Sequence, residues 1–264
     1  MKITPLTEND MSGITALQPV GWNDITPHIY FYIQSHFCFP LKALEDDRLV
    51  GIGTAILHGS TAWLAHIIVH PEYRNRGIGH HITQALIGQL RNTPCETILL
   101  LATEQGKPVY EKSGFQTETT YVFLKGGAIE PQPSSCIVPF DHSFREALLT
   151  MDHQVSGEDR SRLIIPALES ARLFVKDNAL LGYYIPALGD GMIVANIIAA
   201  GVALQSIRSS REPRFSLPAD NAAGVIFLKQ HHYLEYATGY RMTLGKKLRW
   251  DPTQIYNRIG GNFG

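Results

Sequence analysis

Apolar and polar residues alternate along the first half of the chain in a pattern that predicts a strand meander followed by a helix. Two strands are expected within residues 43–57, around a turn at Asp46 and Asp47, because such residues favour tight hairpins. The largely apolar run at 61–69 predicts a third strand. Apolar residues then recur at helical spacing from 82 to 90. The predicted order is therefore strand, turn and helix.

Further elements complete this half, and a linker follows it. They are a helix at 27–37, a buried strand at 97–102, a short helix at 106–113 and a strand pair within 115–124. Gly114 is expected to end the short helix. The stretch 126–135, rich in glycine, proline and serine, is typical of a linker. We therefore expect a first domain at residues 1–127 and a second at 136–264.

The second half repeats this order of elements. It predicts two strands around Asp177 and Asn178, a strand at 192–198, a helix at 201–209, a strand at 214–217 and a helix at 222–231. His232 and Tyr233 then stand where Gly114 and Phe115 stand in the first half. A repeat of about half the chain length indicates a duplicated domain rather than a solenoid.

Composition places the chain among globular proteins. Of its 264 residues, 44% are hydrophobic and 18% are charged, which suits two domains of ordinary size. A net charge of −1 predicts no broad basic face, so we expect no nucleic-acid partner. Three widely spaced cysteines predict neither a disulfide framework nor a metal site. No signal peptide or membrane span is recognised, and we expect a cytoplasmic protein that does not bind membranes.

The turn between the third strand and the helix holds the residues best suited to chemistry. It contains Arg74, Arg76, Gly77 and Gly79. A helix start offers free N–H groups and the positive end of its dipole, and arginines add charge, so the turn suits a phosphate. It lacks the Gly-Lys-Ser/Thr of a Walker loop and the first glycine of a dinucleotide fingerprint. The plain alternative is a surface turn that caps a helix.

Two ordered motifs resemble those of a known family, the GCN5-related N-acetyltransferases (GNAT). Residues 69–79 are Val-His-Pro-Glu-Tyr-Arg-Asn-Arg-Gly-Ile-Gly. The acetyl-CoA motif of the family is Gln/Arg-x-x-Gly-x-Gly/Ala, after a strand that ends in Val-x-Pro-x-Tyr-Arg. Residues 110–115, Tyr-Glu-Lys-Ser-Gly-Phe, are similar to a second family motif. The resemblance covers residues 1–125 and implies that acetyl-CoA is a co-substrate.

The resemblance also implies a fold and a set of binding residues. The fold is α+β, with two GNAT-like domains that each hold a mixed, mostly antiparallel sheet flanked by helices. In this family the turn holds the CoA pyrophosphate, and the preceding strand pairs with the pantetheine amides. The residues assigned to the pyrophosphate are Arg74, Asn75, Arg76, Gly77, Ile78, Gly79 and His80. Those assigned to the pantetheine are Ile67, Ile68 and Val69.

Two side chains are candidates for proton transfer. Tyr110 holds the position where the family often has the acid for the leaving thiolate, and the alternative is a half-buried helix tyrosine. His66 lies on the strand where many relatives place a glutamate, and is either the general base or a buried structural histidine. Strict alternation places His66 on one face with Leu64 and Ile68, whereas a family bulge in this strand changes that assignment.

Other regions bear on the acceptor and on the number of sites. The aromatic-rich region 28–39 is expected either to pack in the core or to line the acceptor. The corresponding turn of the second half, residues 196–201, lacks the arginine and the paired glycines, so we expect one acetyl-CoA site. The tail at 256–258 either contributes to the acceptor pocket or is purely structural.

These features predict an acetyl-CoA-dependent N-acetyltransferase that moves an acetyl group directly to a primary amine. The acceptor is expected to be a small molecule, and the enzyme a monomer or homodimer without a metal. The alternative is a non-catalytic acyl-CoA-binding or sensor protein. Such a protein keeps the turn from Arg74 to Gly79 but lacks the acid and the base.

Overall fold

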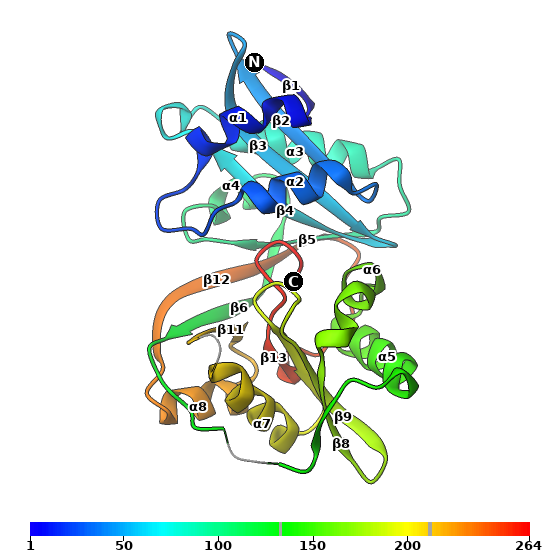
Figure 1. Ribbon diagram of the computed structural model, residues 1–264. Coiled ribbons are helices and arrows are strands. Elements are labelled where there is room, and N and C mark those ends of the chain that lie inside the picture. Colours follow the sequence, from blue (N-terminus) through cyan, green and yellow to red (C-terminus); the bar gives the residue numbers. More distant parts are fainter. Residues whose placement is uncertain (132–133, 211–212) are drawn as a thin grey trace. The chain divides into compact units, whose positions relative to one another are not determined.

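The computed structural model describes residues 1–131, 134–210 and 213–264 (Figure 1). Residues 132 and 133 of the predicted linker therefore lie outside the described residues. The chain forms two compact units. The first unit contains Met1–Gln116, Met242–Lys247 and Phe263, and the second contains Thr117–Arg241, Leu248–Asn262 and Gly264.

These units do not follow a single division of the chain between residues 127 and 136. Residues 117–125 belong to the second unit, and Met242–Lys247 belongs to the first. Each segment is assigned to the unit whose strands it joins. In the second unit β6 (Gln116–Lys125) pairs with β11 (Arg214–Pro218), and in the first unit the end of β12 (Leu234–Gly245) neighbours β5 (Thr97–Ala102). The domain bounds drawn from the sequence stay a prediction.

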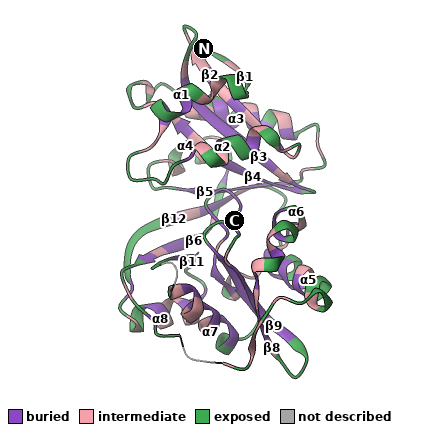
Figure 2. Cartoon of the chain, viewed as in Figure 1, coloured by how far each residue is buried: buried purple, intermediate pink, exposed green. Residues whose placement is uncertain are grey.

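Antiparallel strands dominate the sheet of the first unit. β1, β2, β3 and β4 pair in this order, and β5 runs parallel to β4. The bounds are Lys2–Pro5 for β1, Cys38–Glu45 for β2, Arg48–His58 for β3 and Thr61–Val69 for β4. β3 and β4 are mostly buried (Figure 2) because they lie in the middle of this sheet.

Helices flank this sheet. The bounds are Met11–Ile14 for α1, Thr26–Gln34 for α2, Ile78–Leu90 for α3 and Lys107–Glu111 for α4. α2 has Pro27 in its first turn, where the absent proline N–H is not needed. α3 connects β4 to β5 and packs its apolar side, including Ile82 and Leu86, against β3 and β4. The helix therefore begins at the end of β4.

The second unit has the same kinds of elements. β13, β10, β9, β8 and β7 neighbour one another in this order, and β11 pairs with β6. The strand bounds are Ile137–Pro139 for β7, Arg172–Lys176 for β8, Ala179–Ile185 for β9, Met192–Ala195 for β10 and Ile255–Asn257 for β13. The helices are α5 (Arg145–Ser156), α6 (Ser161–Ile164), α7 (Ile198–Ser209) and α8 (Ala222–Gln230).

The predicted α+β class, with mixed and mostly antiparallel strands, is confirmed. Two element predictions are wrong. Residues 116–124 form part of one continuous strand, β6, rather than a strand pair. The strand predicted at 192–198 ends at Ala195 and α7 begins at Ile198, because the apolar run continues into the helix. Among the described residues, no helix is long and apolar enough to cross a bilayer.

The backbone supports the internal repeat at matched turns. Asp46 and Asp47 between β2 and β3 have φ of 49° and 58°, and Asp177 and Asn178 between β8 and β9 have φ of 50° and 62°. Two successive residues at positive φ make the hairpin turn that fits strand twist. Gly114 and His232, which follow α4 and α8, also share positive φ, at 90° and 65°. The two halves therefore repeat conformation as well as element order.

Candidate functional site

A bulge near the end of β4 is the first feature of the site. Ile68 pairs with Ile52, and Ala65 pairs with Thr54, so two residues of β4 lie opposite the single residue Gly53. His66 is one of the two, and its φ of 47° is in the left-handed region. Such a bulge adds a residue and changes the strand's direction. The simple alternation of faces expected from the sequence therefore ends at Ala65.

The bulge sends two neighbouring side chains to different surroundings. The Oη of Tyr32 in α2 lies 2.9 Å from Nδ1 of His66. A Cβ on Gly53 would lie 3.1 Å from Cγ1 of Ile67 and 2.6 Å from Cγ2 of Ile82 in α3. Ile67 therefore packs toward α3, whereas His66 turns toward α2. Glycine at position 53 leaves room for this close packing.

β4 and β5 separate beyond their first residues. Their parallel pairing runs from Thr61 opposite Thr97 to Trp63 opposite Leu99. β4 continues to Val69 and β5 to Ala102. Past Trp63, the edge of β4 that faces β5 carries no described pairing with that strand, so its backbone N–H and C=O groups can accept an extended ligand. Ile67, Ile68 and Val69, assigned to the pantetheine, lie on this part of β4.

The turn after β4 presents a row of backbone N–H groups. Asn75 and Gly77 have φ of 62° and 79°, and Gly77 is the N-cap of α3. Within the described residues, the backbone N–H groups from residue 75 to residue 80 have no hydrogen-bond acceptor. His81 is the first to donate within the helix, to the carbonyl of Gly77 at 3.0 Å. A row of free N–H groups at a helix N-terminus is a binding site for an anion.

Side chains hold the shape of this turn. The Arg74 Nε donates to the carbonyl of Val69 at 3.2 Å. Arg76 lies over the Tyr73 ring, 4.9 Å from its centroid, and its Nη2 donates to the carbonyl of Glu72 at 3.2 Å. Both arginines are exposed, so their charge is accessible to an anion. Nδ1 of His80 lies 3.0 Å from the hydroxyl of Ser113, a residue of the second motif.

Tyr110 lies in α4 at the start of the second motif. Its ring makes an edge contact with Phe115, with 6.0 Å between centroids. Burial raises the pKa of Tyr110 to about 12, so the hydroxyl keeps its proton at neutral pH and can donate a hydrogen bond.

The imidazole of His66 is surrounded by three aromatic rings. The rings of His28 and Tyr32 lie 5.3 and 5.6 Å away, and that of Trp22 lies 6.1 Å away. Burial first, and then the neighbouring His28, lower the pKa of His66 to about 4. The imidazole is therefore neutral at physiological pH. Tyr32, fully buried, fixes the ring by its hydrogen bond to Nδ1.

The sequence does not point to Tyr32, His28 and Trp22 as neighbours of His66. Their only signal is the abundance of aromatic residues before β2, because the contact with His66 crosses from α2 to the β4 bulge. In the same region Ile29 and Tyr32 are buried, whereas Tyr30 and Phe31 are exposed. The described residues contain no group of three His, Cys, Asp or Glu side chains placed to hold a metal.

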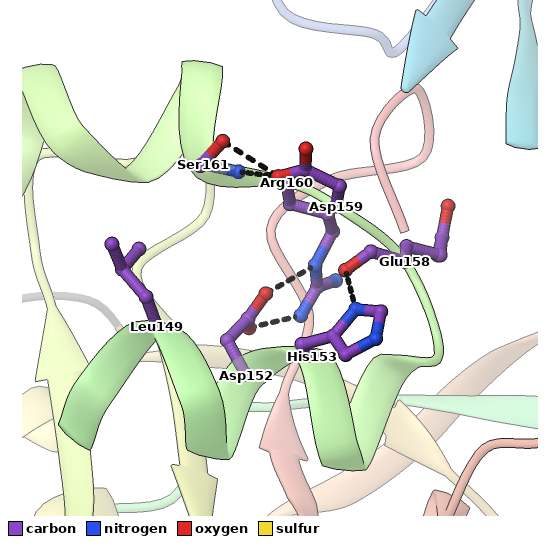
Figure 3. A pocket seen from close by; sticks show the side chains of 7 residues that line it. All are labelled: Leu149, Asp152, His153, Glu158, Asp159, Arg160 and Ser161. Carbon is purple, nitrogen blue, oxygen red and sulfur yellow. Dashed lines mark hydrogen bonds and ion pairs between the residues drawn. The ribbon is translucent and has the colours of Figure 1, made fainter. Parts of the chain in front are cut away.

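A small cavity in the second unit has a different character (Figure 3). Its volume is about 250 Å³, and it is lined by Leu149, Asp152, His153, Glu158, Asp159, Arg160 and Ser161. Arg160 forms two hydrogen bonds with the Asp152 carboxylate, of 3.1 and 2.6 Å. Tyr183 donates to the same carboxylate at 2.6 Å. Because Asp152 and Arg160 satisfy each other, this cluster fits a structural role.

Comparison with known proteins places this geometry in a family. The model of the acetyltransferase (GNAT) family matches residues 10–115. The uncharacterized N-acetyltransferase YitH of Bacillus subtilis (strain 168) is 27% identical over 241 residues, which are 84% of each chain. The match to the family covers β2 to α4, and so includes the bulge, the turn and Tyr110.

Solved structures share the fold. A proposed acetyltransferase from Pyrococcus horikoshii superposes with a TM-score of 0.85 at 21% identity, over 100% of this chain and 95% of that one. A GCN5-related N-acetyltransferase from Anabaena variabilis gives a TM-score of 0.61 at 11% identity, over 92% and 72% of the two chains. Residues 10–115 of this chain match the acetyltransferase (GNAT) family, and these similarities support an N-acetyltransferase.

Proposed function

We propose that the first unit binds acetyl-CoA and transfers its acetyl group directly to a primary amine of a small molecule. The observation that carries this proposal is the row of unpaired N–H groups from residue 75 to residue 80 beside the open edge of β4. One end of this arrangement suits a pyrophosphate and the other suits the amides of a pantetheine arm. The residues present therefore fit the co-substrate.

Each assigned residue has a physical role in binding. The N–H groups of Asn75 through His80 hold the pyrophosphate, and the exposed charges of Arg74 and Arg76 attract it. Gly77 and Gly79 carry no side chain, so the backbone of the turn can approach the pyrophosphate closely. The backbone of residues 67–69 pairs with the pantetheine amides.

The chemistry requires a neutral amine and a stabilised leaving group. The amine nitrogen attacks the thioester carbonyl carbon, the carbon–sulfur bond breaks, and the amine proton finally replaces the acetyl group on sulfur. The Tyr110 hydroxyl, with its pKa of about 12, donates a hydrogen bond to the sulfur as negative charge develops. His66 accepts the proton from the nitrogen after bond formation has made that nitrogen acidic.

One observation favours a second candidate, an acyl-CoA-binding protein without turnover. A base with a pKa of about 4 takes a proton from a free ammonium group only at a large cost. If His66 is purely structural, the unit binds acyl-CoA and lacks a side-chain base. If a chain of water molecules accepted the amine proton in place of His66, the protein would still form an acetylated amine. A sensor would form no such product.

Release of CoA thiol from acetyl-CoA across a panel of small primary amines tests the proposal. We expect turnover with at least one amine and a measurable calorimetric affinity for CoA. Binding of CoA without turnover on any amine would support the sensor. Absence of CoA binding would overturn both candidates. Parallel assays with propionyl-CoA establish whether the acetyl group itself is preferred.

A further inference from the structure

The second unit repeats the strand, turn and helix that carry the site in the first. β10 corresponds to β4, α7 to α3 and β11 to β5, because each follows its predecessor in the same order along the chain. In the first unit, the space between β4 and β5 beyond Trp63 is the expected place of the pantetheine arm. The matching place in the second unit lies between β10 and β11.

The chain's own segment 255–258 occupies that place. β13 pairs antiparallel with β10, with Asn257 opposite Ile193 and Ile255 opposite Val194. On its other side, the N–H of Arg258 donates to the carbonyl of Ser216 in β11 at 2.9 Å. The segment therefore makes backbone hydrogen bonds with both strands, as an added strand does.

Asn257 anchors the segment with both ends of its amide. Its Oδ1 accepts a hydrogen bond from the Ser216 N–H at 2.9 Å. Its Nδ2 donates to the carbonyls of Gly191 at 2.8 Å and Asp190 at 3.1 Å. The side chain is fully buried, so each of these bonds replaces one to water. The Asn257 amide therefore hydrogen-bonds to Ser216 on one side and to Gly191 and Asp190 on the other.

Other buried amides hold the backbone of the segment. Gln205 in α7 donates from Nε2 to the carbonyl of Tyr256 at 3.0 Å. Asn221 at the start of α8 donates from Nδ2 to the carbonyl of Ile255 at 3.0 Å. Side-chain amides thus contact successive carbonyls of one extended chain. This is the chemistry that recognises a polyamide, and a pantetheine arm also carries amides.

The Tyr256 ring fills the space beside α7. A Cβ on Gly201 would lie 2.2 Å from Cζ of this ring, so only glycine fits there. The ring is buried in a cluster that includes Leu204, Leu217 and Leu228. In the first unit, Gly77 at the N-cap of α3 is exposed. The cleft of the second unit is therefore closed by side-chain packing as well as by backbone pairing.

We propose that the cleft between β10 and β11 is the second unit's counterpart of the acyl-CoA groove, and that its ligand is the chain's own segment 255–258. The extended backbone of this segment takes the place of a pantetheine arm. The proposal rests on the function proposed for the first unit. It implies that one chain holds one acyl-CoA and that the second cleft recognises a peptide-like amide chain.

Hydrogen exchange on the full-length protein, read by mass spectrometry, tests the seating of the segment. We expect Asn257→Ala to speed exchange of the amides at 255–258 and 192–195 by about tenfold or more, because local opening becomes easier. Gln254→Ala is the matched control, since this side-chain amide bonds to Asp251 outside the cleft. Gly201→Ala is a second variant, with Gly88→Ala on the open side of α3 as its control.

Titration of the same full-length protein with CoA tests the identity of the cleft. We expect one CoA per chain by native mass spectrometry, with exchange slowed at residues 67–80 and unchanged at 192–195 and 255–258. A second CoA that protects β10, or unchanged exchange in both Asn257→Ala and Gly201→Ala, would overturn the inference. If no CoA binds at all, the function proposed for the first unit fails. Hydrogen exchange in Asn257→Ala and Gly201→Ala still decides whether segment 255–258 is held in its cleft as a ligand.

Discussion

The same strand–turn–helix arrangement is present in both units, but its ligand-facing parts differ. β4 carries a bulge at His66 and leaves β5 after Trp63, whereas β10 is flanked by β13. The turn before α3 has Gly77 at positive φ, and the turn before α7 has Ile197 in extended conformation. The comparison shows that this fold element does not by itself make a binding site. The site requires an edge left open and N–H groups left unpaired.

The largest expected effect comes from treating the halves as separable domains. A fragment of residues 1–127 lacks Met242–Lys247, which the first unit includes. It loses the buried Met242 and the hydrogen bond from the Thr97 hydroxyl to the carbonyl of Lys246, of 2.7 Å. We expect no cooperative unfolding transition by circular dichroism in urea.

The matched control appends residues 240–248 to that fragment through a flexible linker. We expect it to recover a cooperative transition, because the strand next to β5 is restored. Cooperative unfolding of the bare fragment would show that this strand is dispensable. Residues 1–127 would then fold without the segment that the second half contributes to the first unit.

Placing an acidic residue in the turn of each unit tests the contrast directly. Gly77→Asp puts a side chain at positive φ and a carboxylate beside the proposed pyrophosphate. Strain and like charge together suggest a loss of about 4 kcal/mol, or about a thousandfold in CoA affinity. Calorimetry measures it. The counterpart Ala199→Asp, exposed in the first turn of α7, should leave CoA affinity unchanged, and equal losses in both variants would contradict a single site.

Removing the proposed acid separates catalysis from binding. Tyr110→Phe should lower kcat by about a hundredfold and leave the affinity for CoA within error, because the hydroxyl acts at the sulfur. Since the pKa of Tyr110 is about 12, the wild-type rate should show no decline from this group below pH 10. Tyr236→Phe, at an exposed tyrosine of the second unit, is the control. Full turnover by Tyr110→Phe would remove the assigned acid.

The smallest expected effect is a pH dependence of stability set by His66. Its folded pKa is about 4, below the ordinary value of 6.5, so the unfolded chain takes up a proton first as the pH falls. Folding should therefore lose stability from about pH 6.5 downward, by about 2 kcal/mol between pH 7.5 and pH 5. Urea unfolding of wild type and His66→Gln measures the difference between these pH values.

The exposed His36 offers a control substitution, His36→Gln, for which we expect the wild-type pH dependence to persist. A wild-type protein whose stability falls no more than that of His66→Gln would show that the histidine is not held neutral by burial. β10, the counterpart of β4, has no ionisable residue within Met192–Ala195.

Much of the fold could be predicted from the pattern of residues. The strands around Asp46-Asp47 and Asp177-Asn178 follow from alternation and turn residues, and the structure shows positive φ at both turns. The turn and the start of α3 follow from Arg74 to Gly79. The exchange of 117–125 and 242–247 between the units could not be predicted, because a strand's own sequence does not specify which of several sheet edges it joins.

The site divides in a similar way. The motif identifies the residues of the turn, since the need for glycine and a helix start is local. The direction of the His66 side chain depends on a bulge whose register is set by pairing with β3. The hydrogen bond from Tyr32 and the proximity of His28 depend on where α2 packs. No local pattern contains these contacts.

The sequence by itself determined the order of elements, the repeat and the strand–turn–helix motif, because hydrophobic period and turn chemistry act over a few residues. Only the tertiary structure decided which edge stays open, which histidine is neutral and which segment fills the second cleft. Those outcomes depend on contacts between residues far apart in the chain, such as Ser216 with Asn257. The physical reason is that pairing, burial and desolvation are properties of the assembled surroundings rather than of any one segment.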